Sequence, residues 1–156
     1  MFISRSGEYG IIDFKNTVFI YQYEENGLFS LFQEIPIPSN ALFFDLSKSK
    51  EFLVMGFKLG HASIYKKNNS SIYEKIQDFY DSIDDIEGVS ISEDDEIVAF
   101  GDWDRKVFIY RRSGNLFFLN QTISTGFMVN HVKITATDLG IAGKSAKILF
   151  YKNNGT

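Results

Sequence analysis

The chain has 156 residues, enough for one ordinary domain, which we take as residues 1–156. Hydrophobic residues make up 44% and charged residues 23%, close to the globular average, so the composition excludes wholesale disorder. The formal net charge is −4, and no basic run exceeds a pair, which argues against a protein that binds a nucleic-acid backbone through a basic stripe.

The chain contains no cysteine, which excludes disulfides, thiol catalysis and cysteine-ligated zinc. The N-terminal residues lack the long apolar segment of a secretory signal. No apolar stretch approaches the ~20 residues that span a bilayer. We therefore expect a soluble, intracellular, cytoplasmic protein that binds neither membrane nor nucleic acid.

The first predicted unit covers residues 1–40. It begins with a strand within Met1–Ser4, and the apolar run Val18–Tyr21 predicts a later strand. Polar residues at Glu24–Gly27 predict a turn after that strand, and Gln33 follows late in the unit.

The second predicted unit covers residues 41–85 and repeats this order. Leu46-Ser47 leads into a turn, the apolar run Ala62–Tyr65 predicts a strand, and Lys67–Ser71 predicts the next turn. Gln77 again stands late in the unit.

The third predicted unit covers residues 86–129 and shows the pattern most clearly. Its segments are short, rich in Val, Ile, Phe and Tyr, and separated by polar turns, as expected of strands. The four predicted strands are Ile86–Ser92, Glu96–Asp102, Lys106–Arg111 and Leu116–Ile123.

The fourth predicted unit covers residues 130–156 and is shorter. Asn130–Ile134 predicts its first strand, and the run Ile148–Tyr151 predicts its third. We expect this unit to lack its fourth, outer strand.

Three markers recur along the chain with one period and in one order. An aliphatic residue followed by Ser or Thr recurs at spacings of 43, 45 and 43 residues. The tyrosine that ends each apolar run recurs at spacings of 44, 45 and 41, and the late glutamine at 44 and 44. A shared period of this length indicates an internal repeat of four-stranded units.

The third strand of the third unit, Val107–Tyr110, is continuously apolar. A strand with one solvated face should alternate with period two, so a continuous run indicates that both faces are covered. Four-stranded sheets stacked around an axis cover both faces of their middle strands. The sequence therefore favours an all-β propeller or partial propeller of about four antiparallel blades. A closed small barrel or sandwich is a third, poorer interpretation.

The segment from Val89 to Tyr110 resembles a WD-repeat. Ile91–Asp95 corresponds to the turn before the second strand of that family, and Gly101 to the glycine that ends the second strand. Asp104 corresponds to the aspartate of the following turn, and Tyr110 replaces the terminal tryptophan.

The resemblance covers nearly the whole chain but weakens outside the third unit. The second unit has Gly56 but Leu59 at the turn-aspartate position, and the fourth has Gly143 before a shorter turn. The family's Gly-His pair is absent, and Ser82 and Thr125 fall near the expected histidine. The Ser-His-Asp-Trp hydrogen-bond network of the family should therefore be mostly missing.

The resemblance implies a protein-interaction scaffold without enzymatic activity. About four units are too few for the usual rings of this family, and a partial ring exposes apolar blade faces and strand edges. We expect the chain to be completed in one of three ways: by a copy of itself in a dimer of about eight blades, by a protein partner, or as part of a longer propeller.

The predicted partner contacts combine the resemblance with residue chemistry. The residue before the turn aspartate lies on the partner-contacting surface of the family, which indicates Trp103 and its counterpart Lys58, and tryptophan is a frequent interface anchor. Nearby basic residues complete the prediction: Arg105, Arg111 and Arg112. We predict no catalytic residue, no cofactor and no metal ligand; the two histidines, His61 and His131, are too few for a zinc site.

The alternative function is a propeller-type hydrolase or carbohydrate-binding protein with a central acidic site. Its candidate residues are Asp84, Asp85, Asp94 and Asp95. Convergence of two of these carboxylates in a central pocket would favour the alternative, whereas scattered carboxylates would favour the scaffold.

Overall fold

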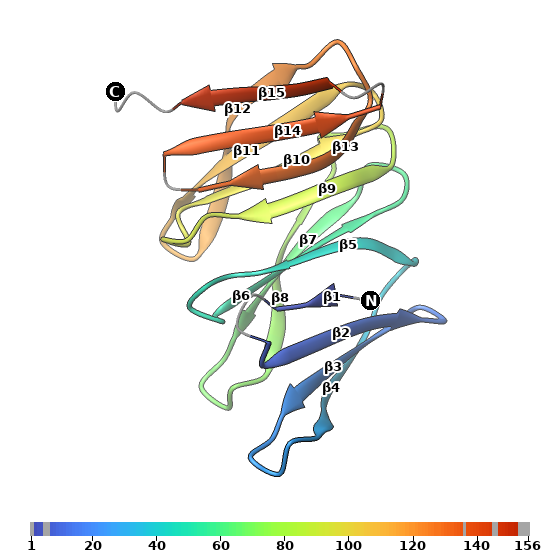
Figure 1. Cartoon of the computed structure of the whole chain (residues 1–156), viewed down its shortest axis with the longest axis vertical. Coiled ribbons are helices and arrows are strands. Elements are labelled where there is room, and N and C mark those ends of the chain that lie inside the picture. Colours follow the sequence, from blue (N-terminus) through green and yellow to red (C-terminus); the bar gives the residue numbers. More distant parts are fainter. Residues whose placement is uncertain (1, 5–6, 136, 145–146, 153–156) are drawn as a thin grey trace.

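The computed structural model describes residues 2–4, 7–135, 137–144 and 147–152. These residues form 15 strands in four antiparallel sheets and contain no helix (Figure 1). Met1 and residues 153–156, at the outer limits of the first and last predicted units, lie outside the described residues.

Each sheet is built from strands that follow one another in the chain. The first sheet contains β1 (Phe2–Ile3), β2 (Tyr9–Phe14), β3 (Thr17–Tyr23) and β4 (Phe29–Pro36). The second contains β5 (Ala41–Leu46), β6 (Phe52–Phe57), β7 (Ala62–Lys67) and β8 (Tyr73–Phe79). The third contains β9 (Ile86–Ile91), β10 (Ile97–Asp102), β11 (Lys106–Ser113) and β12 (Leu116–Ser124). The fourth contains β13 (Val129–Ile134), β14 (Asp138–Gly143) and β15 (Lys147–Lys152).

The predicted fold class is confirmed: the described residues form four antiparallel blades, and the fourth has three strands. The blades stack along the long axis of the molecule, from β1–β4 at one end to β13–β15 at the other (Figure 1). The first strands of all four blades line one cavity of about 500 Å³. This common axis contradicts the barrel or sandwich interpretation.

The recurring serine of the repeat fixes the turn between the first and second strands of each blade. The Oγ atoms of Ser4, Ser47 and Ser92 each accept a hydrogen bond from the amide five residues later, at 3.0, 3.0 and 2.9 Å. Thr135 Oγ1 accepts from Asp138 N, three residues later, which matches the shorter turn of the fourth blade.

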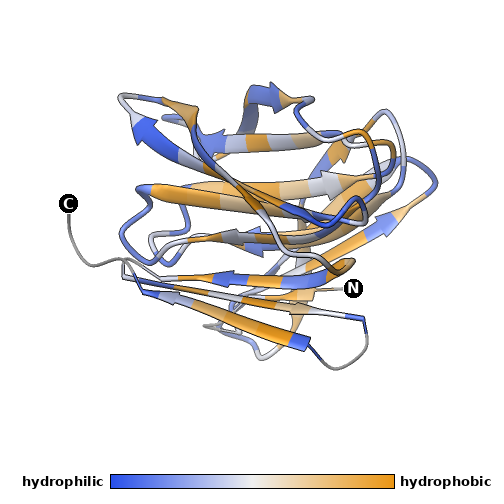
Figure 2. Ribbon diagram, turned by 90° about the horizontal axis from the view of Figure 1, so that it is seen from above, coloured by the Kyte–Doolittle hydropathy of each residue, from blue (hydrophilic) through white to orange (hydrophobic). Residues whose placement is uncertain are grey.

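The core consists of three layers, each between two successive blades. Every residue of β6 and β10 is buried, because alternate side chains of these strands pack against the blade before and the blade after. Hydrophobic stretches accordingly follow the strands in Figure 2. The third strands of the middle blades are covered on both faces, as predicted: Ala62–Tyr65 is buried throughout, and within Val107–Tyr110 only Ile109 is half-buried.

Glycine permits close approach between blades at one repeated position. A Cβ atom on Gly56 of β6 would lie 2.5 Å from Ile86 Cγ2, and one on Gly101 of β10 would lie 2.4 Å from Val129 Cγ1. In both cases the contacted side chain belongs to the next blade. The repeated glycine therefore allows neighbouring blades to pack near the axis.

Candidate interaction surfaces

Three of the predicted contact residues lie at one edge of the middle blades. Lys58 follows β6, and Trp103 and Arg105 lie in the turn between β10 and β11. Trp103 is 37% exposed, and Lys144 Nζ of the fourth blade lies 5.2 Å from its ring centroid. The tryptophan therefore leans toward the neighbouring blade and keeps part of its ring accessible.

Sequence reasoning missed three exposed apolar residues at this edge. Leu59 is 84%, Ile83 79% and Tyr80 70% exposed. Contacts join their segments: Leu59 N donates to Asp85 Oδ1, and Trp103 N donates to Asp85 O. We call these apolar residues the turn-edge patch: Leu59, Tyr80, Ile83 and Trp103. These four residues lie in connections between strands, where hydrophobic residues follow no regular spacing, so the sequence pattern did not indicate that they form a patch.

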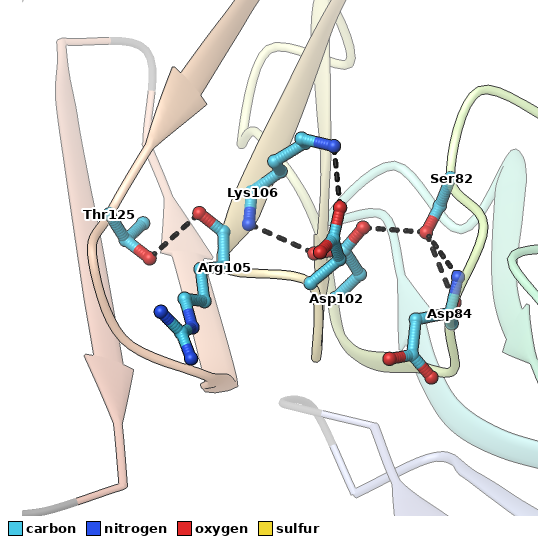
Figure 3. Close-up of polar contacts among 7 residues, drawn as sticks. Ser82, Asp84, Asp102, Arg105, Lys106 and Thr125 are labelled. Carbon is cyan, nitrogen blue, oxygen red and sulfur yellow. Dashed lines mark hydrogen bonds and ion pairs between the residues drawn. The ribbon is translucent and has the colours of Figure 1, made fainter.

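A buried carboxylate supports this edge (Figure 3). Asp102 is 1% exposed; its Oδ2 accepts a 2.6 Å hydrogen bond from Ser82 Oγ, and its Oδ1 accepts one of 2.9 Å from Lys106 N. Burial raises the pKa of Asp102, and the two hydrogen bonds oppose that rise. Asp104 lies in the turn, as expected from the resemblance, but its carboxylate pairs with Lys106 Nζ, and Asp102 rather than Asp104 binds Ser82.

Thr125, in the connection between the third and fourth blades, also binds a neighbouring turn. Its Oγ1 donates to Arg105 O at 3.0 Å (Figure 3). Its backbone N donates to the same oxygen at 2.8 Å. Ser82 and Thr125 thus fasten the connections between blades to the turns beside them. The full Ser-His-Asp-Trp network is replaced by these shorter contacts.

The predicted pair Arg111 and Arg112 lies near the other end of β11 and does not join the turn-edge patch. Arg112 donates to Glu96 Oε1 and lies 5.5 Å from the centroid of the Phe52 ring, so it ties the third blade to the second. Arg111 is exposed and lines a cavity between the third and fourth blades.

The four candidate acidic residues do not converge. Asp84 and Asp85 precede β9, whereas Asp94 and Asp95 follow it, so the two pairs lie at opposite ends of this strand. Asp94 Oδ1 accepts hydrogen bonds from Ser92 Oγ and Glu96 N within its own turn. None of the four lines the central cavity. Scattered carboxylates do not favour the hydrolase or carbohydrate-binding alternative.

The central cavity instead contains Asp45 at its wall. Asp45 Oδ2 accepts hydrogen bonds from Ser90 Oγ, Ile91 N and Lys133 Nζ at 3.0, 3.0 and 3.2 Å. Ser90 Oγ in turn accepts from Ile134 N. This carboxylate therefore joins β5, β9 and β13.

His61 belongs to a hydrogen-bonded cluster in the second blade. Its Nε2 lies 3.0 Å from Asp78 Oδ1 and 3.2 Å from Ser63 Oγ, while Ser63 Oγ donates directly to Asp78 at 2.6 Å. A catalytic triad needs the histidine to bridge serine and carboxylate through different nitrogens, so this arrangement lacks that geometry. His131 lies on β13 at the central cavity. Within the described ranges, no three His, Cys, Asp or Glu side chains form a group that could hold a metal ion.

The outward face of the first blade is apolar and exposed. We call it the N-end face; Ile12 and Phe14 of β2 are 38% and 59% exposed, and Phe29 and Leu31 of β4 are 46% and 49% exposed. Residues at the same positions of β6, Met55 and Phe57, are both 0% exposed because the first blade covers them.

The outward face of the fourth blade, the C-end face, is also uncovered. Ile148 and Phe150 of β15 are 60% and 81% exposed. Val107 and Ile64, which hold the same positions relative to the repeated tyrosine, are both 0% exposed. The third strand is thus apolar in both the middle and the end blades, but only in the middle blades does a neighbouring blade bury these side chains.

No protein-family model and no curated protein sequence matches the chain. Solved structures that share its fold include that of U3-55K, at 14% identity and a TM-score of 0.74, and the crystal structure of the RRP9 WD40 repeats, at 13% identity and a TM-score of 0.75. Each match covers 97% of this chain, which spans 50% and 49% of the two matched chains. The described residues contain no helix long and apolar enough to cross a membrane.

Proposed function

We propose that this chain, whose fold is that of a WD-repeat propeller, is a non-enzymatic scaffold for protein–protein interaction. One observation carries the proposal: the N-end and C-end faces present apolar side chains that are buried at equivalent positions of the middle blades. Contiguous exposed apolar surface on a folded protein marks an interaction site. Rigid blades then hold the turn-edge patch and the end faces in fixed positions.

The two end faces are complementary in kind. Inside the molecule, the side of each blade that faces the next blade in the chain packs through a hydrophobic layer on the side of that next blade that faces back toward it. The C-end face is the side of the fourth blade on which a next blade would pack. The N-end face is the side of the first blade on which a preceding blade would pack. Two copies arranged head to tail would bury both pairs of faces in a two-fold ring of about eight blades.

Light scattering of the purified chain tests self-completion. At micromolar concentration we expect a mass of two chains, because each contact buries several large apolar side chains. Phe150→Asp, on the C-end face, should give a monomer. The matched control is Leu59→Asp, which changes an exposed apolar residue away from both end faces and should leave the dimer intact.

A soluble, folded monomer at micromolar concentration would contradict self-completion. Comparative affinity capture then decides whether a protein partner occupies the same faces. A partner of the end faces should be retained by Leu59→Asp and lost by Phe150→Asp. A partner of the turn-edge patch should show the reverse and should also be lost by Trp103→Ala.

A further inference from the structure

Three glutamines occupy one register position in successive blades. Gln33 pairs with Ile20, Gln77 with Ile64 and Gln121 with Ile109, each in the outer strand opposite the third strand. In all three pairs the register shifts immediately after that isoleucine. The shared bulge gives the three glutamine side chains equivalent placements.

Two of these glutamines hold the outer strand of the following blade. Gln33 Nε2 donates to Tyr73 O and its Oε1 accepts from Tyr73 N, both at 2.8 Å. Gln77 does the same to Phe117, at 2.7 and 2.8 Å. The held residue is aromatic in each case, and it is buried: Tyr73 is 3% and Phe117 is 1% exposed.

The third glutamine, Gln121, holds no outer strand of a following blade among the described residues. Gln121 is exposed, and its side chain has no hydrogen-bond partner within the described part of the chain. Beside it lies a cavity of about 250 Å³ between the two blades; its lining includes the apolar residues Ile97, Ile123 and Leu139 together with polar ones such as Arg111, Asn120 and Asp138. Ile97 holds the position at which Phe52 of the second blade contacts the Phe117 ring edge to face, with centroids 5.7 Å apart.

The fourth blade is also uncovered where an outer strand would lie. Tyr151 of β15 lines the cavity and is 38% exposed, whereas the matching tyrosines, Tyr65 and Tyr110, are 5% and 2% exposed. The edge of β15 away from β14 pairs with no strand of the described chain. An open strand edge, the side-chain amide of Gln121 without a partner in the described chain, and a cavity with several apolar lining residues therefore lie at one place.

We propose that this place binds an extended segment of a partner polypeptide, which pairs antiparallel with β15 and places an aromatic side chain in the cavity. Gln121 would bind the backbone N–H and C=O of that aromatic residue. The proposal deepens the proposed scaffold function and rests on it, since it names the chemistry of one partner. Strand addition to an open edge is an established mode of peptide binding.

The two occupied sites define the register of the segment. Lys75 is opposite Tyr65, and Leu119 is opposite Tyr110; the aromatic residue that glutamine holds stands two positions earlier in both blades. The partner's aromatic residue should therefore stand two positions before the residue opposite Tyr151. The segment comes from another polypeptide rather than a second copy, because the strands with this pattern, β4, β8 and β12, are already held in their own blades.

A labelled peptide with the sequence of residues 70–80 is the probe, since it contains Tyr73 and the strand that Gln33 holds. Fluorescence anisotropy should show that it binds the chain. Gln121→Ala should weaken binding about tenfold, the loss expected for two hydrogen bonds. Thr122→Ala, an exposed neighbour whose side chain points to the opposite face of β12, should leave binding unchanged. Replacing the peptide's tyrosine by alanine should also weaken binding.

Cysteine cross-linking tests the register, because the chain has no cysteine of its own. Glu74 is opposite Lys66, and Lys152 is the counterpart of Lys66 in β15. Lys152→Cys should therefore cross-link faster to a peptide with cysteine at the position of Glu74 than to one with cysteine at Phe79. Equal rates would contradict the proposed register.

The outcomes separate this inference from the scaffold proposal. No peptide binding, or binding that Gln121→Ala leaves unchanged, overturns the inference, while the effect of Phe150→Asp on the mass still decides the scaffold. If Gln121→Ala alone converts a dimer to a monomer and the peptide dissociates the dimer, a second copy supplies the strand. That result would overturn the assignment to a foreign segment.

Discussion

Asp102 is the residue on which the turn edge depends most directly. It is buried at the end of β10, and both of its carboxylate oxygens accept hydrogen bonds, from Ser82 Oγ and from Lys106 N. These two contacts join the connection before the third blade to the turn inside it. A buried donor that loses its acceptor costs about 1–3 kcal/mol.

Asp102→Ala should therefore lower the free energy of unfolding by about 1–3 kcal/mol, because the Lys106 amide loses its acceptor and Ser82 loses one of its partners. Asp102→Asn keeps the size of the side chain and one acceptor oxygen, so its loss should be smaller. Urea unfolding measures both. Equal loss in the two variants would show that the hydrogen bonds are not the source of the stability.

Asp78 offers a test of pH dependence. Burial raises its pKa, but hydrogen bonds from Ser63, Lys75 and His61 outweigh burial, so the pKa lies below its usual value of 3.8. A carboxyl whose pKa is lower in the folded than in the unfolded chain adds stability above the unfolded pKa. That stability is lost as the pH falls through the folded pKa.

Asp78→Asn should accordingly lower the melting temperature at pH 7 and reduce the difference between the melting temperatures at pH 7 and pH 3. Thermal unfolding followed by circular dichroism gives both values. Glu25→Gln, in an exposed turn, is the control and should melt like the parent chain at each pH. A parallel downward shift of Asp78→Asn at all pH values would contradict the stated cause.

At the scale of the strand, glycine marks where one blade approaches the next. Gly101→Ala would place its Cβ 2.4 Å from Val129 Cγ1 and 2.6 Å from Val132 Cγ2. Overpacking of this kind costs about 1–3 kcal/mol. The same substitution at Gly10 meets no atom closer than 3.8 Å, because Gly10 lies on the N-end face.

We therefore expect Gly101→Ala to destabilise the fold by about 1–3 kcal/mol and Gly10→Ala to leave it unchanged or slightly more stable. Chemical denaturation of the two variants gives the comparison. Similar losses at both positions would point to backbone conformation rather than contact between blades.

The strand pattern was largely predictable, because short-range chemistry determines it. In the third blade the observed strands begin and end within two residues of those expected. The serine marker was visible because its hydrogen bond spans only five residues. The glutamine marker was equally visible, but its role was not, because Gln33 and Gln77 bind residues 40 positions away in the next blade.

The candidate site was less predictable. Spacing alone did not distinguish Asp102 from Asp104, since both fall near the turn and only the coordinates show which one Ser82 reaches. Lys58, Trp103 and Arg105 stay predicted contacts at the turn edge. The sequence did not indicate that Arg111 and Arg112 lie apart from them, because residues only a few positions apart on a strand reach opposite ends of the blade.

At the scale of the molecule, the exposed end faces link stability to concentration. Association that buries the end faces favours the folded chain by mass action. The melting temperature of the parent chain should therefore rise over a hundredfold increase in protein concentration. Phe150→Asp should melt at one temperature throughout, and calorimetry at both concentrations checks this. A parent melting temperature independent of concentration would contradict association in the folded state.

The layered core has a consequence for how the molecule comes apart. Each hydrophobic layer involves only two adjacent blades, so the stability of a blade depends mainly on the blades directly beside it. The outermost slices have one neighbour and the middle slices have two. Amide protons should consequently exchange with solvent first in β1–β4 and β13–β15 and last in β6 and β10, because the end blades unfold locally before the middle blades do.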